Sequence, residues 1–208
     1  FYRSLPFTLT DAQRRCVEEA IGDMCSGKPM NRLCQGDVGS GKTMVAAACV
    51  YFCVKNGRQA ALMVPTELLA EQHYRGLAPL LEKLNIRCAL LTGSTPAKTK
   101  RSVTAQLASG EIDFAIGTHA LISDSVAYAD LGLVVTDEQH RFGVAQRTAL
   151  AEKGSHPHTL VMSATPIPRT LALILYGDLD VSVIDQLPPG RKPMETYAVT
   201  SAYYPRLY

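Results

Sequence analysis

The stretch Gly36-Asp37-Val38-Gly39-Ser40-Gly41-Lys42-Thr43 determines how the rest of the chain is interpreted. It fits the pattern G-x-x-x-x-G-K-[ST], in which loop N–H groups hold phosphates, the lysine reaches the β- and γ-phosphates, and the hydroxyl binds Mg²⁺. Residues 30–35 before it are typical of a short strand, and residues 44–54 after it are typical of a helix. A strand, a glycine loop and a helix in this order predict a nucleotide site with phosphate at the helix N-terminus.

The composition indicates an ordinary globular protein. Its 208 residues, 47% of them hydrophobic and 19% charged, suit one large α/β domain with a sizeable core. A net charge of +2 neither requires nor excludes a polyanionic partner. The sequence contains no apolar run of about 18 residues and no signal-peptide pattern, so we expect a cytoplasmic protein without a membrane partner. Its six cysteines form no C-x-x-C pair and are expected to be reduced core residues.

Strand and helix patterns alternate along the chain. Helices are expected at about residues 11–26, 66–84 and 97–108, and strands at 59–64, 86–91, 112–116, 131–136, 159–162 and 181–184. Such alternation predicts a mostly parallel sheet covered by helices on both faces. The segment His156-Pro157-His158 is expected to be a loop without a metal. The domain should span residues 1–186, because residues 187–193 resemble a linker; residues 187–208 would hold that linker and the start of a second domain.

Polar side chains follow most of the predicted strands, where open α/β sheets bind their ligands. Asp137 and Glu138 follow the most apolar strand. A carboxylate at Asp137 can hold Mg²⁺ opposite the Thr43 hydroxyl, and Glu138 can orient and deprotonate a water that attacks the γ-phosphate. The other such clusters are Thr66-Glu67, Gly93-Ser94, Thr118-His119, Gln139-His140 and Ser163-Ala164-Thr165.

Two of these clusters, and Gln13 near the start of the chain, have simpler structural interpretations. Thr66 fits a helix N-cap, and Gly93-Ser94 fits a turn. Gln13 either closes a capping box with Thr10 or hydrogen-bonds an adenine base, and the residues alone favour the cap.

Taken together, the motifs resemble superfamily-two helicases and translocases, in which two RecA-like domains hold ATP between them. The resemblance covers nearly the whole chain. Residues 137–144, Asp-Glu-Gln-His-Arg-Phe-Gly-Val, are similar to the extended second motif of the RecG family, of the transcription-repair coupling factor and, more distantly, of the primosomal helicase. Gln139, residues 5–15 and the linker at 187–193 favour the RecG family.

This resemblance implies a RecA-like P-loop domain that uses ATP and Mg²⁺. Lys42, Asp137 and Glu138 would be catalytic, Thr43 and Asp137 would hold the metal, and Gln13 would contact adenine rather than act only as a cap. Coupling of hydrolysis to domain motion would involve Gln139, His140, Ser163, Ala164, Thr165 and Arg169. Contacts to the DNA backbone would come from Pro65, Thr66, Thr92, Gly93, Ser94, Thr118 and His119.

The same resemblance implies the partners. They would be branched DNA, meaning stalled forks and Holliday junctions, with a second RecA-like domain and an N-terminal wedge domain of the same full-length protein, which we expect to be monomeric. Without the second domain this chain should bind nucleotide and hydrolyse it poorly, since that domain supplies arginines to the reaction. Two other functions stay open: a duplex-DNA translocase of the transcription-repair coupling type, and a nucleotide-sensing interaction module.

Overall fold

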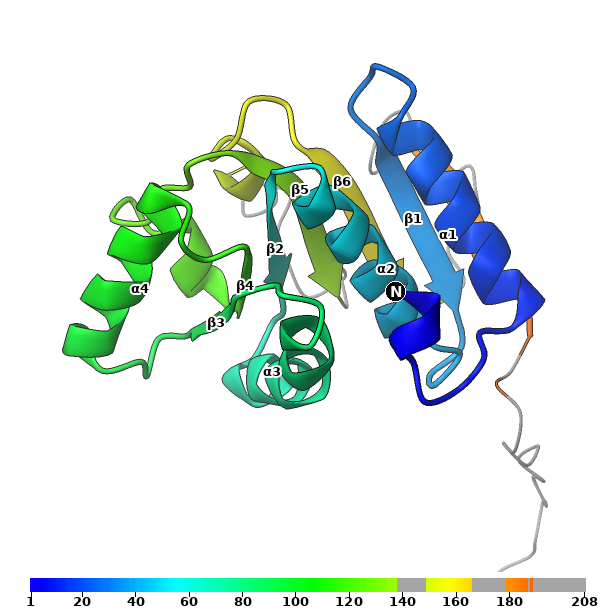
Figure 1. The fold of residues 1–208 in the computed structure, drawn as a ribbon, viewed down its shortest axis with the longest axis horizontal. Helices are drawn as coiled ribbons and strands as arrows, with labels where there is room; N and C mark the ends of the chain where they lie inside the picture. Colours follow the sequence, from blue (N-terminus) through cyan, green and yellow to red (C-terminus); the bar gives the residue numbers. More distant parts are fainter. Residues whose placement is uncertain (138–148, 166–178, 187, 189–208) are drawn as a thin grey trace, which may run out of the picture.

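The computed structural model describes residues 1–137, 149–165, 179–186 and 188 (Figure 1). Its helices are η1 (Tyr2–Ser4), α1 (Asp11–Met24), α2 (Lys42–Lys55), α3 (Glu67–Glu82), α4 (Ala97–Ser109) and η2 (His119–Ile122). Its strands are β1 (Asn31–Gly36), β2 (Gln59–Met63), β3 (Cys88–Leu91), β4 (Phe114–Gly117), β5 (Leu131–Asp137), β6 (His158–Ser163) and β7 (Asp180–Ile184). Every predicted strand and helix is confirmed within a few residues at each end. The two 3-10 helices were not predicted.

The strands form one seven-stranded sheet in the order β3-β4-β2-β5-β6-β1-β7. All the described pairings are parallel. The carboxyl ends of the strands therefore lie along one edge, which is the lower edge in Figure 1, where the arrowheads of β1, β2 and β5 point. The predicted parallel sheet is confirmed, and the segments that follow its strands share one side of the molecule.

Helices cover both faces of this sheet. On one face, α1, α2 and α3 pack over alternate residues of the strands, such as Leu62, Phe114 and Leu133. On the other face, α4 and η2 pack over the intervening residues, such as Met63 and Val134. Burial on both faces explains why β2 and β5 read as nearly continuous apolar runs rather than as alternating patterns.

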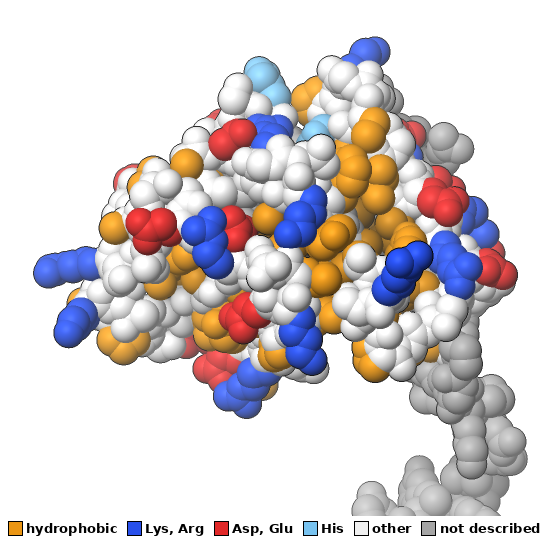
Figure 2. Space-filling view, viewed as in Figure 1, with side chains coloured by type: hydrophobic (Ala, Val, Ile, Leu, Met, Phe, Trp, Pro, Cys, Tyr) orange, Lys and Arg blue, Asp and Glu red, His pale blue; other side chains and the backbone are white. Residues whose placement is uncertain are grey.

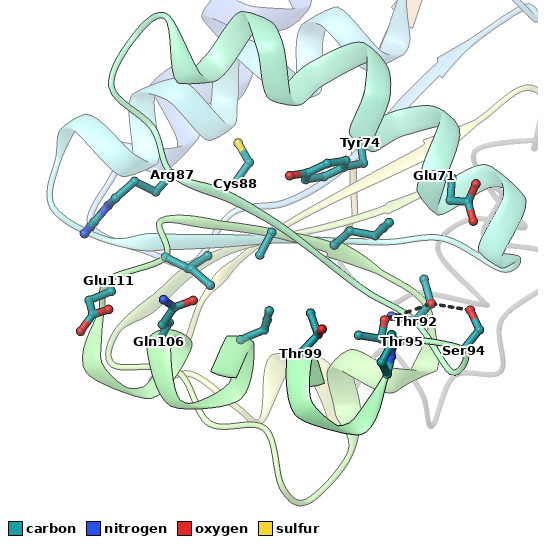
Figure 3. A pocket seen from close by; sticks show the side chains of 15 residues that line it. Glu71, Tyr74, Arg87, Cys88, Thr92, Ser94, Thr95, Thr99, Gln106 and Glu111 are labelled. Carbon is teal, nitrogen blue, oxygen red and sulfur yellow. Dashed lines mark hydrogen bonds between the residues drawn. The ribbon is translucent and has the colours of Figure 1, made fainter. Parts of the chain in front are cut away.

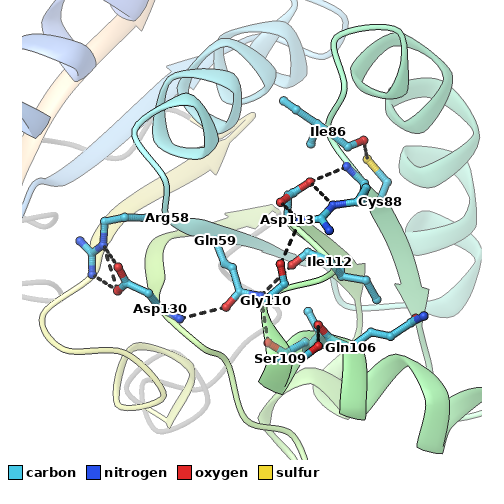
Figure 4. A network of polar contacts seen from close by, with 12 residues as sticks. Arg58, Gln59, Ile86, Cys88, Gln106, Ser109, Gly110, Ile112, Asp113 and Asp130 are labelled. Atoms are coloured by element: carbon cyan, nitrogen blue, oxygen red, sulfur yellow. Dashed lines mark hydrogen bonds and ion pairs between the residues drawn. The ribbon is translucent and has the colours of Figure 1, made fainter.

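A polar network fixes the opposite edge of the sheet, where β2 and β5 begin (Figure 4). The Gln59 side chain is only 5% exposed. Its amide nitrogen donates to the carbonyls of Leu107 (3.0 Å) and Ile112 (2.7 Å), and its amide oxygen accepts from the Asp130 N–H (3.0 Å). The neighbouring Arg58 pairs with the Asp130 carboxylate at 2.8 Å. This network satisfies the buried amide and joins the end of α4 to the starts of two strands.

A second polar cluster joins β1 to its neighbours α1 and β7. The Arg32 guanidinium of β1 donates to the carboxylates of Asp23 (2.6 Å) and Glu19 (3.2 Å) on α1, and to the Ser182 hydroxyl on β7 (2.7 Å). Ser182 in turn donates to Glu19. Because the Arg32 side chain is 10% exposed, these contacts compensate for the loss of water around its charge.

The cysteines are free thiols, as expected, and most of them lie in the core. Burial raises the pKa of Cys49 and of Cys53 to about 12. The buried set is Cys16, Cys34, Cys49 and Cys53, whereas Cys25 is exposed and Cys88 is half-buried. No helix within the described ranges is long and apolar enough to cross a membrane.

Candidate functional site

The phosphate loop connects the end of β1 to the start of α2. Gly39 and Gly41 have φ of +76° and +92°, a backbone region that favours glycine. Gly36 is required for a different reason, because a Cβ there would lie 2.6 Å from the Ser40 Oγ. The helix begins at Lys42, two residues earlier than expected. The three glycines of the motif are therefore explained by the loop backbone itself.

The Lys42 side chain binds the backbone of this loop. Its Nζ donates to the carbonyl oxygens of Gly36 (2.6 Å) and Asp37 (2.9 Å), and the residue is 8% exposed. The buried Ser40 Oγ has no hydrogen-bond partner within the described part of the chain. An ammonium and a free hydroxyl in a loop of backbone N–H groups form a site suited to an anion.

Gln13 contacts the same loop from α1. Its side-chain oxygen accepts from the Thr10 N–H (3.0 Å), while the Thr10 hydroxyl accepts from the Gln13 N–H (3.2 Å). The capping box is therefore confirmed. In addition, the Gln13 Nε2 donates to the Ser40 carbonyl at 2.7 Å. One side chain thus starts α1 and holds the phosphate loop, and the contact to adenine stays a prediction.

A cavity of about 410 Å³ lies beside the loop, between α2 and α3. Lys42, Thr43 and Asp137 all line it, as does Ala164 after β6. The structure therefore brings together three residues assigned to phosphate, metal and catalysis, although Asp137 lies 94 positions after Thr43 in the chain. A hydroxyl, a carboxylate and a lysine around one cavity are a donor set suited to a metal-bound polyphosphate.

Asp137 has a partner that the sequence did not suggest. The His73 Nε2 of α3 lies 3.0 Å from the Asp137 Oδ2, and the two side chains are 11% and 14% exposed. His73 also lines the cavity. Its position seven residues after Thr66, on the same face of the helix, is the one signal that could have identified it.

The residues assigned to DNA follow β2, β3 and β4, which are adjacent in the sheet. Thr66 caps α3, its hydroxyl accepting from the Leu69 N–H at 3.3 Å, and Gly93-Ser94 forms a turn, so both structural interpretations are confirmed. The Glu67 carboxylate accepts from the Ser94 N–H at 2.9 Å, and hydrogen bonds from Ser94 lower the pKa of Glu67. The segments after β2 and β3 are therefore connected.

Hydroxyl groups gather at this edge. The Thr92 Oγ1 lies 3.1 Å from the Ser94 Oγ, and the Thr92 N–H donates to the Thr95 hydroxyl at 2.9 Å. These three residues line a second cavity, of about 730 Å³, beside β3 and between α3 and α4 (Figure 3). The Thr118 Oγ1 is buried without a partner among the described residues, and the exposed His119 begins η2. Pro65 is half-buried between β2 and α3.

The residues assigned to coupling are only partly described. Ser163 ends β6 and is 1% exposed. Its hydroxyl lies 3.0 Å from the Thr165 hydroxyl and accepts from the Thr165 N–H at 3.2 Å. This local turn places Ala164 at the nucleotide cavity. Glu138, Gln139, His140 and Arg169 lie outside the described residues, as does nearly all of the segment 187–208.

The charges on the face seen in Figure 2 are mixed, with Lys and Arg side chains lying among acidic and apolar ones. Lys98 and Arg101 on α4 are exposed, and Lys100 between them is half-buried. His158, expected in a loop, instead begins β6, where it pairs with Leu133 of β5, and its Nδ1 accepts from the Met30 N–H at 2.9 Å. The described residues contain no cluster of His, Cys, Asp and Glu that could hold a metal ion on its own.

The sequence is similar to helicases over most of its length. The DEAD/DEAH box helicase family matches residues 10–174. The ATP-dependent DNA helicase RecG of Streptococcus pneumoniae is 56% identical over 204 residues, which are 98% of this chain and 30% of that protein. RecG of Bacillus subtilis is 57% identical over 199 residues, which are 96% of this chain and 29% of that protein. The chain thus spans less than a third of these relatives.

Solved structures share the fold. A structure of RecG bound to a three-way DNA junction matches with a TM-score of 0.86 and 50% identity, over 99% of this chain and 27% of that one. The DEAD-box helicase Mss116 bound to single-stranded RNA and UDP-BeF matches with a TM-score of 0.66 and 19% identity, over 85% of this chain and 40% of that one. The second likeness concerns the fold alone. The expected RecA-like architecture is confirmed.

Proposed function

The chain belongs to the DEAD/DEAH box helicase family, and on this basis we propose that it is the ATP-binding motor domain of a helicase that remodels branched DNA. One observation carries the proposal. Lys42 and Thr43 line one cavity at the N-terminus of α2 together with Asp137, which lies 94 positions after Thr43 in the chain. A polyphosphate there meets the lysine, the loop N–H groups and the helix dipole together.

Within this site, Lys42 exchanges its two carbonyl acceptors for the oxygens of the β- and γ-phosphates. The oxygens of Thr43 and Asp137 border the same cavity and fit Mg²⁺, which is usually held by one or two carboxylates together with phosphates. When bound, Mg²⁺ would neutralise charge on the phosphates. Glu138 orients and deprotonates the attacking water, and Gln13 contacts the adenine base.

The proposed DNA contacts lie along the edge after β2, β3 and β4. Hydroxyl groups at Thr66, Thr92, Ser94 and Thr118 suit phosphate oxygens, which carry no base sequence. Contacts of this kind fit a motor that moves along DNA of any sequence. The coupling of hydrolysis to domain motion is assigned to Gln139, His140, Ser163, Ala164, Thr165 and Arg169.

The remaining parts of the motor are proposed to lie outside this chain. Residues 1–186 form the first motor domain, and residues 187–208 link it to a second RecA-like domain of the same protein. That domain and a wedge domain would act with it on forks and Holliday junctions, where the RecG relatives support a branched substrate. Alone, the chain binds nucleotide and hydrolyses it poorly, since the second domain supplies arginines.

The deciding experiment measures ATP hydrolysis by the full-length protein that contains this chain. Forked DNA, linear duplex and structured RNA are compared as stimulators at one salt concentration, since salt alters all nucleic-acid binding. Preferential stimulation by forked DNA is expected. Equal stimulation by linear duplex would instead indicate a translocase of the transcription-repair coupling type, and stimulation by RNA alone would contradict a DNA motor.

Two variants make the test specific. Lys42→Ala should weaken binding of a fluorescent ATP analogue about 10- to 100-fold, as expected for the loss of charge-assisted hydrogen bonds. Lys55→Ala, at the other end of α2, is the matched control and should bind as the unmodified protein does. Glu138→Gln should bind ATP and lose translocation. A Glu138→Gln protein with unchanged cellular function would favour a nucleotide-sensing module.

A further inference from the structure

Helix α3 contacts both proposed sites. At its N-terminal end, Thr66 caps the helix and Glu67 binds the Ser94 N–H, so this end belongs to the edge assigned to DNA. Two turns further on, His73 contacts the carboxylate of Asp137 in the nucleotide cavity. The helix therefore spans the distance between the two sites without an intervening loop.

The contacts of α3 favour movement as one rigid element. Thr66, Ala70, His73 and Leu77 follow one another at intervals of three or four residues and so share a face of the helix. Ala70 and Leu77 on this face are 0% and 1% exposed and pack in the core. His73 lies about 10 Å along the axis from Thr66, given a rise of 1.5 Å per residue. A displacement at the cap is therefore carried to His73.

The contact at His73 is suited to orienting Asp137. The imidazole is 11% exposed, and its Nε2 lies within hydrogen-bond distance of one carboxylate oxygen, Oδ2. Groups that hold a metal-binding carboxylate by its second oxygen fix its rotation, and their loss typically costs 10- to 100-fold in metal affinity or activity. Glu67 lies at the N-terminal end of the same helix, where its carboxylate joins α3 to the turn after β3.

We propose that His73 is a positioning residue for Asp137, and that α3 transmits engagement of the DNA edge to this metal-binding carboxylate. The inference rests on the function proposed above, because it needs a metal at Asp137 and DNA at Thr66 and Ser94. It adds a specific physical path: DNA that moves the turn at Ser94 moves Glu67, α3 and His73, and so reorients Asp137.

The first test measures nucleotide binding, without turnover, in the full-length protein. A fluorescent ATP analogue is titrated with Mg²⁺ and with EDTA, and the ratio of the two affinities is the readout. In His73→Ala this ratio should fall at least about tenfold, because the affinity in Mg²⁺ should fall more than the affinity in EDTA. His73→Gln, which retains an N–H at a similar reach, should recover most of the ratio. Arg75→Ala, on the exposed side of the same helix, is the control.

The second test measures the ratio of ATPase rates with and without forked DNA. Both His73→Ala and Glu67→Ala should lower this ratio at least about fivefold, the lower range of allosteric coupling. Only His73→Ala should also change the Mg²⁺-dependent affinity. This difference separates the residue that positions Asp137 from the residue that connects the DNA edge to the helix.

These two tests separate failure of the inference about His73 from failure of the proposed motor function. A His73→Ala protein with unchanged Mg²⁺-dependent affinity and unchanged stimulation overturns the inference while the motor function stands. If the unmodified protein is not stimulated by any DNA, the proposed function fails, and transmission through α3 fails with it. Should the alanine variant not fold, His73→Leu, which fills similar space without a polar atom, replaces it in both measurements.

Discussion

The side-chain amide of Gln13 donates to the main-chain carbonyl of Ser40 at 2.7 Å, joining the first turn of α1 to the phosphate loop. The same Nε2 would lie 2.2 Å from a Cβ at Gly41. The Gln13 side chain and the phosphate loop therefore pack closely against each other.

We predict that Gly41→Ala weakens nucleotide binding by deforming the loop. Alanine at a φ of +92° is strained by about 1–3 kcal/mol, and its Cβ would displace the Gln13 amide. A titration with a fluorescent ATP analogue should show at least a tenfold loss, about 1.4 kcal/mol. Gly22→Ala is the control, because Gly22 is a helical glycine with open space around its Cβ position.

The Gly22→Ala protein should bind nucleotide normally and be more stable by up to about 1 kcal/mol, since alanine favours a helix. Adding Gln13→Ala to Gly41→Ala removes the collision and leaves the backbone strain. Gln13→Ala alone is measured beside it, because this variant loses the Ser40 contact and the proposed adenine contact. A double variant that binds better than Gly41→Ala would assign part of the loss to the collision. Full binding by Gly41→Ala alone would contradict the close fit.

Arg32→Met should lower the free energy of unfolding by about 2 kcal/mol. The substitution removes the cation that the carboxylates of Asp23 and Glu19 share, while Glu19 keeps its pair with Arg15 at 4.0 Å. Because the two carboxylates are 27% and 37% exposed, the loss is smaller than the roughly 3–5 kcal/mol typical of fully buried pairs. Urea denaturation measures the difference. Arg75→Met breaks the exposed pair with Glu71 and should cost less than about 0.5 kcal/mol. Equal losses in the two variants would show that burial does not matter here.

Protonation of His158 should contribute to acid destabilisation. Burial, with a further contribution from Arg58, lowers the pKa of His158 below its ordinary value of 6.5, and Asp23 opposes this effect. The unfolded chain then binds the proton more readily than the native protein, so stability falls as the pH drops below 6.5. Above pH 6.5 the neutral His158 makes its full contribution to the free energy of unfolding. This contribution is lost as the pH falls from 6.5 to the pKa of His158 in the native protein.

The variant His158→Asn tests this prediction. Its side-chain oxygen can accept from the Met30 N–H, as Nδ1 does, and it does not titrate. Between about pH 7.5 and about pH 5.5 its unfolding free energy should fall less than that of the unmodified protein. His156→Asn controls for loss of a histidine, because His156 is exposed and its positive φ of 54° suits asparagine. Parallel curves for His158→Asn and the unmodified protein would contradict the prediction.

Thiol labelling of the native protein should show one rapid group among the six cysteines. Cys25 is exposed, whereas burial raises the pKa of Cys49, Cys53 and Cys88 to about 12 and keeps these thiols unreactive. Reaction with an aromatic disulfide reagent, followed by absorbance, measures the rates. Cys25→Ser should remove the fast phase, and denaturant should expose all the remaining thiols. A fast phase that survives Cys25→Ser would contradict this assignment.

The sequence was sufficient to predict most of the fold, because the strands after the phosphate loop carry strong signals. Residues 131–136 form an unbroken apolar run, and a strand buried on both faces needs such a run. The parallel alternation then placed the predicted ligand residues at one edge. The ends of elements were predicted less accurately. β3 begins at Cys88 rather than at residue 86, because the Ile86 N–H still donates to the Leu81 carbonyl of α3.

Contacts between distant segments could not be predicted. Periodicity identified α3 as a helix, yet the approach of His73 to Asp137 depends on how that helix packs over the sheet. For Gln13, pattern reasoning treated the cap and a ligand contact as alternatives. The structure shows that the same amide caps α1 and binds the Ser40 carbonyl, because one side of the amide accepts while the other donates.

Strand β7 covers the edge of β1 and is the last strand of the described sheet. It pairs with β1, and its last residue, Ile184, packs closely against Gly36 at the start of the phosphate loop. Without β7, the strand that leads into the loop would become an edge strand, with a row of unpaired N–H and C=O groups open to other molecules. A protein cleaved before residue 180 would therefore expose β1, the strand that leads into the phosphate loop, to pairing with other molecules.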